Sequence, residues 1–127
     1  MAKQSSILVL AEPSRMRDGL QALLETLWQG PILTGSDTAI ISKAITETDQ
    51  AVVLLDAALA NVNVCDTLHW LKTTYPKLTC VALVDHIHQE QLAKTAGADA
   101  VLLKGFSTEQ LYGVVNRISH VQMQGSL

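Results

Sequence analysis

Residues 51–56 have the sequence AVVLLD, five consecutive apolar residues that end on an acid. A short apolar run without alternating polar positions predicts a β-strand that is buried on both faces, as the strands of parallel sheets are. Comparable runs lie at residues 7–10, 79–84 and 101–103, and a weaker one lies at residues 32–34. The sequence therefore predicts five strands, the third of which ends on Asp56.

The segments between these strands carry apolar residues at helical spacing. Ser14 is a good N-cap, and leucines and a methionine recur at helical intervals from Met16 to Leu27, until Gly30-Pro31 ends the pattern. Four further helices are expected: one after Ser36-Asp37, one that contains Val64 to Leu71 and is ended by Tyr75-Pro76, one over 89–95, and a last one that Ser107 caps.

Strict alternation of strands and helices decides the fold class. Five strands alternating with five helices predict a single doubly wound α/β domain with a parallel sheet and helices on both faces. The expected strand order is 2-1-3-4-5, the flavodoxin-like arrangement. We expect the domain to cover residues 1–120 and the polar segment 121–127 to form a flexible tail.

The composition excludes several classes of function. Hydrophobic residues make up 48% of the chain, charged residues make up 17%, and the net charge is -3. The basic residues are scattered, so we expect no direct binding of nucleic acid. No apolar stretch approaches the length of about 20 residues that spans a bilayer. We expect a cytoplasmic protein, without a membrane anchor and without a disulfide between its two cysteines.

Charged residues end three of the predicted strands. Glu12 follows the first strand, Asp56 ends the third and Lys104 follows the fifth. Parallel sheets of this kind place their chemistry outside the carboxyl ends of the strands, where the first and third strands are neighbours. Two neighbouring carboxylates repel unless a cation lies between them, and Mg²⁺ prefers such oxygen ligands. With the Lys104 ammonium nearby, the set predicts an acyl phosphate formed on Asp56.

These residues lie within three motifs that resemble response regulator receiver domains. The first strand and helix do so through ILVLAE at 7–12 and RDGL at 17–20, the third strand through VVLLD at 52–56, and the fifth through AGADAVLLK at 96–104. The resemblance extends from about Ile7 to Ile118. It is strongest to receivers that are joined to helix-turn-helix output domains.

The resemblance implies a role for each charged residue. Glu12 and Asp56 would bind Mg²⁺, Asp56 would accept a phosphoryl group from a histidine kinase, and Lys104 would contact that group. It also implies a signalling module rather than an enzyme. The new charge would alter a surface formed by the fourth helix, the fifth strand and the fifth helix, and this surface would bind a downstream partner or a second copy of the chain.

Five positions depart from the family pattern. Ala11 replaces a second acid, Val84 a Ser or Thr hydroxyl, Val101 an aromatic switch residue, Gly105 a proline after the lysine, and Ala60 a proline in the loop after Asp56. Valine has no hydrogen-bond donor, so the usual coupled movement of hydroxyl and aromatic ring is lost. These departures favour an alternative, a pseudo-receiver that binds its partner without phosphorylation.

Asp85 leaves two interpretations open. It could replace the missing metal ligand, or it could cap the following helix. Side chains alternate along a strand, so if Val84 faces the site, Asp85 is expected to face away from it.

A cofactor enzyme on the same fold is not expected. The first loop, Glu12-Pro13-Ser14-Arg15, lacks the Ser, Thr and Gly content of a phosphate-cradling loop, and the chain has no Gly-x-Ser-x-Gly elbow. The sequence therefore offers no binding site for an organic cofactor.

Overall fold

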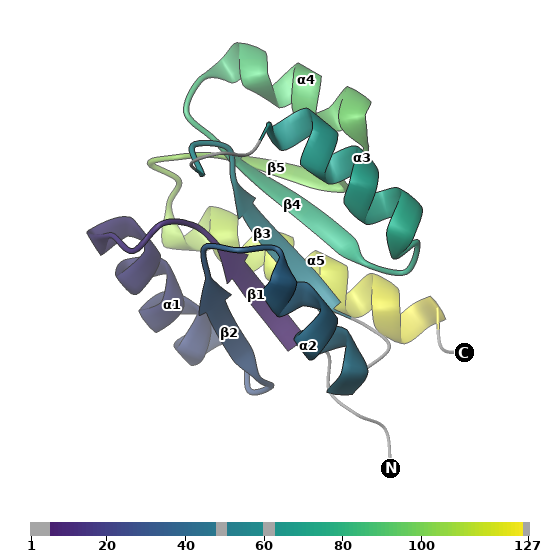
Figure 1. The fold of residues 1–127 in the computed structure, drawn as a ribbon. Helices are drawn as coiled ribbons and strands as arrows, with labels where there is room; N and C mark the ends of the chain where they lie inside the picture. The colour runs from purple at the N-terminus through teal and green to yellow at the C-terminus, as the bar shows by residue number, and fades with distance from the viewer. Residues whose placement is uncertain (1–5, 48–50, 60–62, 126–127) are drawn as a thin grey trace.

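The computed structural model describes residues 6–47, 51–59 and 63–125, and side chains are described for 6–43, 51–59 and 63–116. These residues form one five-stranded sheet with the order β2-β1-β3-β4-β5 (Figure 1). Every neighbouring pair of strands is parallel. The predicted doubly wound α/β fold and its strand order are therefore confirmed.

The strands lie where the apolar runs predicted them. Their bounds are β1 Ser6–Leu10, β2 Ile32–Gly35, β3 Ala51–Asp56, β4 Thr79–Val84 and β5 Ala100–Leu103. All residues of β1 and β3 are buried, as expected for central strands that are covered on both faces.

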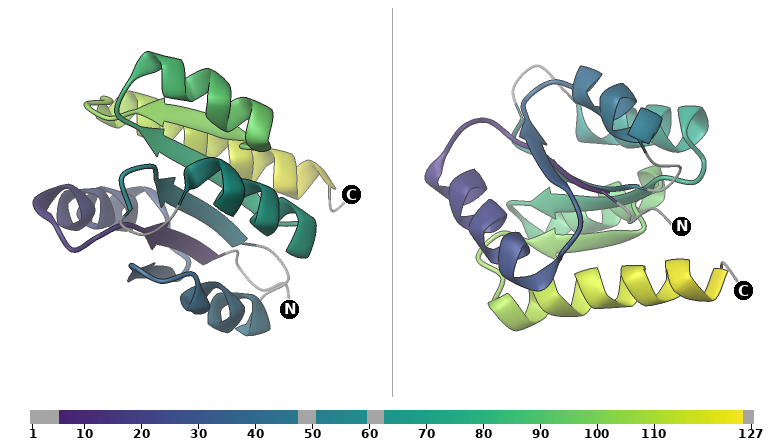
Figure 2. Two further views of the ribbon diagram at one scale, coloured as in Figure 1. Left: turned by 45° about the horizontal axis from the view of Figure 1, so that its top comes forward. Right: turned by 90° about the horizontal axis from the view of Figure 1, so that it is seen from below.

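The helices form a layer on each face of the sheet. Their bounds are α1 Arg15–Leu27, α2 Ala39–Glu47, α3 Val64–Thr74, α4 Ile87–Ala96 and α5 Thr108–Gly125. Figure 2 shows α1 and α5 on one face, with α2 and α3 on the other. Helix α4 packs against α3, β4 and β5.

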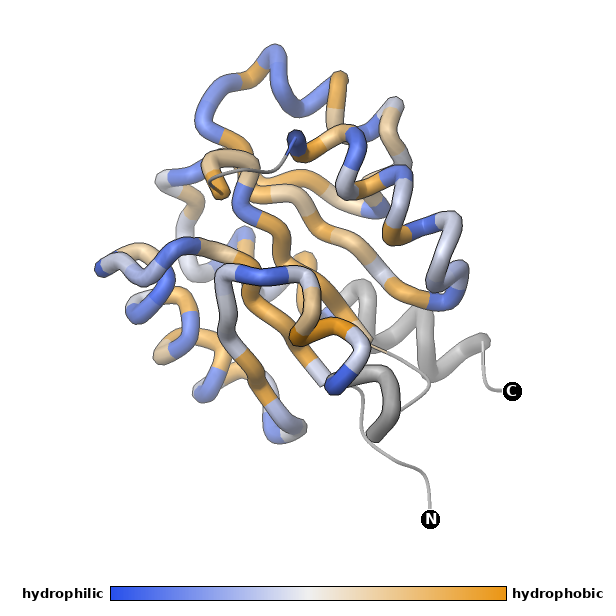
Figure 3. The backbone as a smooth tube through the Cα atoms, viewed as in Figure 1, coloured by the Kyte–Doolittle hydropathy of each residue, from blue (hydrophilic) through white to orange (hydrophobic). Residues whose placement is uncertain are grey.

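Two apolar clusters fill the space between the sheet and these layers. One joins Leu20 and Leu24 of α1 and Leu111 of α5 to alternate residues of the strands. The other joins Leu68 and Leu71 of α3 to the remaining strand residues. Figure 3 shows the result, with the most hydrophobic segments along the strands and polar residues on the outer faces of the helices. The core thus holds the strand ends at a defined edge.

Two helix starts confirm the predicted caps. The Ser14 hydroxyl accepts a hydrogen bond from the backbone N–H of Arg17, 3.1 Å away. At α5, the Ser107 hydroxyl accepts from the N–H of Gln110, and the Gln110 side chain accepts from the N–H of Ser107. Such reciprocal bonds satisfy N–H groups that the first turn of a helix leaves unpaired.

Helix α4 begins two residues before the predicted start at Gln89. The reason is the Gln89 side chain, whose Oε1 accepts from the backbone N–H groups of Asp85 and His86. A capping contact of this kind depends on a side-chain conformation, which apolar periodicity does not reveal.

Helix α5 continues to Gly125, beyond the predicted domain end at residue 120. The segment 121–127, predicted as a flexible tail, thus overlaps this helix, and residues 126–127 lie outside the described residues. Within the described part of the chain, no helix combines the length and the apolar character needed to cross a bilayer.

Candidate functional site

The carboxyl edge of the sheet brings together residues from four strands. The register pairs Leu10 of β1 with Leu55 of β3, so Ala11 follows beside Asp56. On the other side of β3, Asp56 pairs with Leu83 of β4. The last residues of β4 and β5 also lie side by side, since Val84 pairs with Leu103. This edge is the position at which the fold class places its chemistry.

Asp56 supplies a buried carboxylate at this edge. It is the last residue of β3 and only 7% exposed. Its Oδ1 accepts a hydrogen bond from the backbone N–H of Ala58, 2.9 Å away, and contacts Lys104 Nζ at 2.5 Å. These contacts leave Oδ2 without a hydrogen-bond donor from the described residues, so Oδ2 is the oxygen available for chemistry.

Lys104 is held at the same edge by its backbone and by its side chain. Its N–H donates to the carbonyl oxygen of Val84 at 2.8 Å, which extends the pairing of β5 with β4 by one residue. The side chain then reaches Asp56. The predicted convergence of Asp56 and Lys104 on one site is therefore observed.

The lysine also contacts Asp85, whose role and direction the sequence alone does not decide. Asp85 Oδ1 lies 3.2 Å from Lys104 Nζ. The expectation that Asp85 faces away was conditional on Val84 facing the site, and Val84 instead lies in the apolar cluster with residues of α3 and α4. The sequence did contain a signal for this contact: Asp85 directly follows the strand that pairs with the strand before Lys104.

Both carboxylates influence the ionisation of Lys104. Partial burial lowers its pKa, but hydrogen bonds and charge attraction from Asp56 and Asp85 outweigh that effect, so that the pKa of Lys104 is raised above its usual 10.5. The lysine is therefore a firmly protonated ammonium at neutral pH. With all three groups ionised, two negative charges face one positive charge.

Glu12 occupies the predicted strand end but stands apart from the ion-paired cluster. It is exposed and follows the buried Ala11. Among the described residues, the ion pairs of Asp56 and Asp85 involve Lys104, and none includes Glu12. The structure therefore brings Asp56 and Lys104 together and leaves Glu12 on the β1 side of Asp56.

The donor set on this side limits how a metal could bind. The described residues contain no group of three His, Cys, Asp or Glu side chains that could hold a metal ion. Arg17 lies close to the same strand end, since its Nη1 donates to the carbonyl oxygen of Ala11 at 3.0 Å. Mg²⁺ commonly binds through one or two carboxylates together with water and phosphate oxygens. The Asp56 carboxylate and Glu12 fit that minimal pattern, but not a cage of several acids.

The departures from the receiver pattern are now placed in the structure. Val84 is fully buried among apolar residues of β4 and α4, and the half-buried Val101 packs against the same cluster. Gly105 has a φ of 91°, a left-handed conformation that proline cannot adopt. Ala60 lies outside the described residues.

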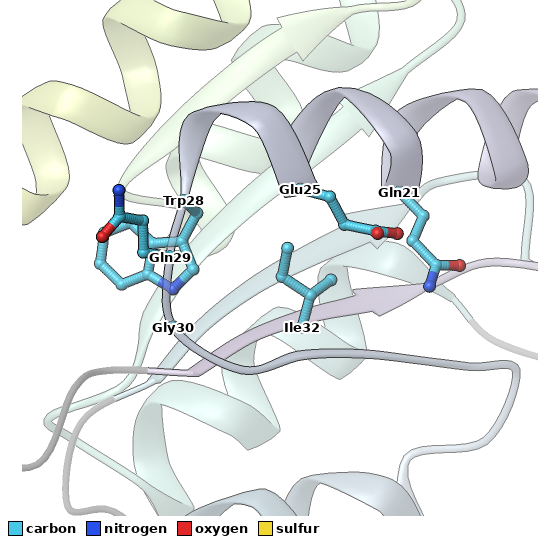
Figure 4. Close-up of a pocket in the computed structure, with 6 residues that line it drawn as sticks. All are labelled: Gln21, Glu25, Trp28, Gln29, Gly30 and Ile32. Atoms are coloured by element: carbon cyan, nitrogen blue, oxygen red, sulfur yellow. The ribbon is translucent and has the colours of Figure 1, made fainter.

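A shallow hollow lies elsewhere on the molecule. Figure 4 shows its lining, which comes from α1 and the turn that leads into β2: Gln21, Glu25, Trp28, Gln29, Gly30 and Ile32. This turn adjoins the start of β1, because the N–H of Ile7 donates to the carbonyl oxygen of Pro31. The hollow is thus at the opposite edge from Asp56 and contains none of the predicted site residues.

Comparison with solved structures agrees with the fold. A response regulator receiver domain protein from Clostridium thermocellum superposes with a TM-score of 0.81 at 23% identity, covering 95% of this chain and 98% of that chain. The chain has the receiver-domain fold. The signal receiver domain of a DNA-binding response regulator (merR) from Colwellia psychrerythraea 34H gives a TM-score of 0.81 at 17% identity, over 92% of this chain and 99% of that one.

A third similar structure belongs to a DNA-binding response regulator of the LuxR family from Staphylococcus aureus. It superposes with a TM-score of 0.74 at 18% identity, covering 91% of this chain and 99% of that chain. No protein-family model and no curated protein matches the sequence. At these identities the comparisons establish the shared receiver fold.

Proposed function

We propose that the protein is a signalling receiver that accepts a phosphoryl group on Asp56 from a histidine kinase. The observation that carries the proposal is the contact between the Lys104 ammonium and Asp56 Oδ1 at the carboxyl edge of the sheet. It leaves a carboxylate with one oxygen held and the other free, beside a fixed positive charge. The free oxygen can attack phosphorus, and the positive charge can stabilise the transferred phosphoryl group.

The transfer is a displacement at phosphorus. Asp56 Oδ2 attacks the phosphorus atom of a phosphohistidine, an O–P bond forms, and the P–N bond breaks. The imidazole leaves and takes a proton from solvent. Lys104 donates to an oxygen of the phosphoryl group and offsets part of its negative charge. Asp56 is consumed as an acceptor in this step, so the chain is the substrate of the kinase and not an enzyme in its own right.

Mg²⁺ is part of the proposal. Glu12 and the Asp56 carboxylate would hold it, and when bound it supplies positive charge to the phosphoryl oxygens. With Ala11 in place of a second acid, we expect weak binding that depends on the phosphoryl oxygens as additional ligands. A cytoplasmic location is also part of the proposal, as is a sensor histidine kinase as the partner.

The read-out surface proposed is the face formed by α4, β5 and α5. Two large apolar side chains are exposed there, Leu103 at the end of β5 (44%) and Tyr112 on α5 (52%). Ile87 at the start of α4 is exposed as well. A downstream protein or a second copy of the chain would cover these side chains. Sedimentation of Tyr112→Ala, with Trp70→Ala on α3 as a control of similar exposure, tests the surface.

Intact-mass measurement tests phosphorylation directly. The protein is incubated with Mg²⁺ and phosphoramidate, whose P–N bond breaks to release ammonia. We expect the mass of one added phosphoryl group, lost in Asp56→Asn and retained in Asp66→Asn, an exposed acid in the first turn of α3. Removal of Mg²⁺ with a chelator is expected to suppress the adduct. An adduct that persists in Asp56→Asn would refute the assignment of the acceptor.

A pseudo-receiver is the second candidate, and the buried Val84 favours it. This position, which carries a hydroxyl in the family that the sequence resembles, has no exposed surface and no hydrogen-bond donor in its side chain. A chain that forms no adduct, and whose partner binding is unchanged by Asp56→Asn, would have this second function.

A further inference from the structure

Asp85 stands at the site without a role in the proposed transfer. It follows β4, its carboxylate is 39% exposed, and its Oδ1 lies 3.2 Å from Lys104 Nζ. Lys104 therefore divides its hydrogen-bond donors between two carboxylates, Asp56 and Asp85. Its ammonium group has only three donors, so each one used by Asp85 is withheld from a phosphoryl oxygen.

We propose that Asp85 is a positioning residue that competes with the phosphoryl group for Lys104 and thereby lowers the phosphorylated fraction of the protein. This inference rests on the proposed function of Asp56. Asp85 would then limit the fraction of the protein that is phosphorylated on Asp56.

Charge makes the competition stronger once Asp56 is phosphorylated. The acyl phosphate carries about two negative charges where the Asp56 carboxylate carried one, and Asp85 contributes a further one near the same ammonium. Val84 offers no donor at this strand end, so Lys104 has no neighbouring hydroxyl to share the contact. The donor that Lys104 gives to Asp85 is therefore not available to the phosphoryl oxygens.

The strand order argues against Asp85 as the replacement for the missing metal ligand. Strand β3 lies between β1 and β4, so Glu12 flanks Asp56 on one side, while Asp85 and Lys104 flank it on the other. A metal held by Glu12 and Asp56 lies on the β1 side. Asp85 thus acts on the lysine and not on the metal.

The test measures the phosphorylated fraction of the protein in a matched pair of variants. Asp85→Asn keeps the shape of the side chain and removes its charge. Glu90→Gln is the control, because Glu90 is 38% exposed and also pairs with a lysine, Lys94, but lies away from the site on α4. With phosphoramidate and Mg²⁺, we expect Asp85→Asn to raise the phosphorylated fraction about threefold, as fits a partly exposed ion pair. Glu90→Gln is expected to equal the parent protein.

A second readout does not depend on phosphorylation. In urea unfolding, Asp85→Asn is expected to lower stability in the parent protein but not in a Lys104→Met background, since the two residues are coupled. Equal losses in both backgrounds would overturn the pairing.

The outcomes separate the two proposals. A phosphoryl adduct that is equal in the parent protein and in Asp85→Asn would overturn the role of Asp85 and leave the proposed function intact. If neither protein forms an adduct, the proposed function fails and the competition fails with it. An adduct that forms only in Asp85→Asn supports both.

Discussion

The backbone N–H of Lys104 donates to the carbonyl oxygen of Val84 at 2.8 Å, and this bond brings the lysine to the end of β4. The side chain consequently reaches Asp85, the residue after Val84, as well as Asp56 on the next strand. The geometry of one main-chain hydrogen bond thus determines which carboxylates share the ammonium. The charge balance of the site follows from the pairing of β4 with β5.

Loss of the lysine is expected to cost more stability than loss of the aspartate. Lys104→Met leaves the Asp56 carboxylate, whose side chain is 9% exposed, with a backbone N–H but no countercharge. We expect a cost of about 2 kcal/mol in the free energy of unfolding. Asp56→Asn leaves Lys104 paired with Asp85, so its cost should stay below about 1 kcal/mol. Urea unfolding of both variants checks the difference, and a larger loss in Asp56→Asn would contradict it.

The fold was predictable because its strands are continuous apolar runs. Residues 51–56 and 79–84 were predicted as strands and lie in β3 and β4 with the same bounds. Burial on both faces removes the ambiguity of which side faces the core. Strand order then followed from the rules for parallel connections.

The site was only partly predictable. Asp56 and Lys104 could be paired from the sequence because strand ends of a parallel sheet meet at one edge. The direction of Asp85 stayed open because it depended on that of Val84, which the sequence does not determine and which the structure buries in the apolar cluster. The start of α4 was missed for a related reason, because a side-chain cap from Gln89 and not an apolar repeat determines it.

Restoring the proline of the family pattern is expected to damage the loop after Lys104. Gly105 has a φ of 91°, whereas a proline ring holds φ near -65°. Gly105→Pro should therefore cost about 1 kcal/mol or more in the free energy of unfolding. Gly105→Ala is the comparison, because its Cβ would meet no atom within 4 Å and only the positive φ would be unfavourable. A melting temperature of Gly105→Pro equal to that of the parent would show that the loop adopts another conformation.

Asp99 is expected to stabilise the edge of the sheet opposite the site. Its Oδ2 accepts from the backbone N–H of Cys80 at 2.8 Å and from Lys72 Nζ at 3.0 Å. Asp99→Ala removes both bonds, and we expect a loss of about 1 to 2 kcal/mol, since the carboxylate is partly exposed. Asp99→Asn keeps an oxygen for Cys80 and should lose less. Chemical denaturation ranks the two variants, and equal losses would assign the whole effect to the charge.

Alkaline pH is expected to weaken the fold through Cys80. Burial raises the pKa of the Cys80 thiol from 9.0 to about 12. The charge of Lys72 lowers this pKa by a smaller amount, and the charge of Asp99 raises it. Above pH 9.0 the unfolded chain loses this proton, while the folded protein keeps it until the pH nears the raised value. The free energy of unfolding should then fall by up to about 1.4 kcal/mol per pH unit across this window.

Two cysteine variants isolate that contribution. Cys80→Ala removes the buried thiol and should flatten the fall of stability between pH 9.0 and about 12. Cys65→Ala removes a half-buried thiol at the start of α3 and should preserve the fall. Lys104 also loses its stabilising charge as the pH rises through its raised pKa, but it does so equally in both variants. The difference in slope between the two urea-unfolding series therefore reports Cys80, and parallel slopes would show that its thiol ionises as freely in the folded protein as in the unfolded chain.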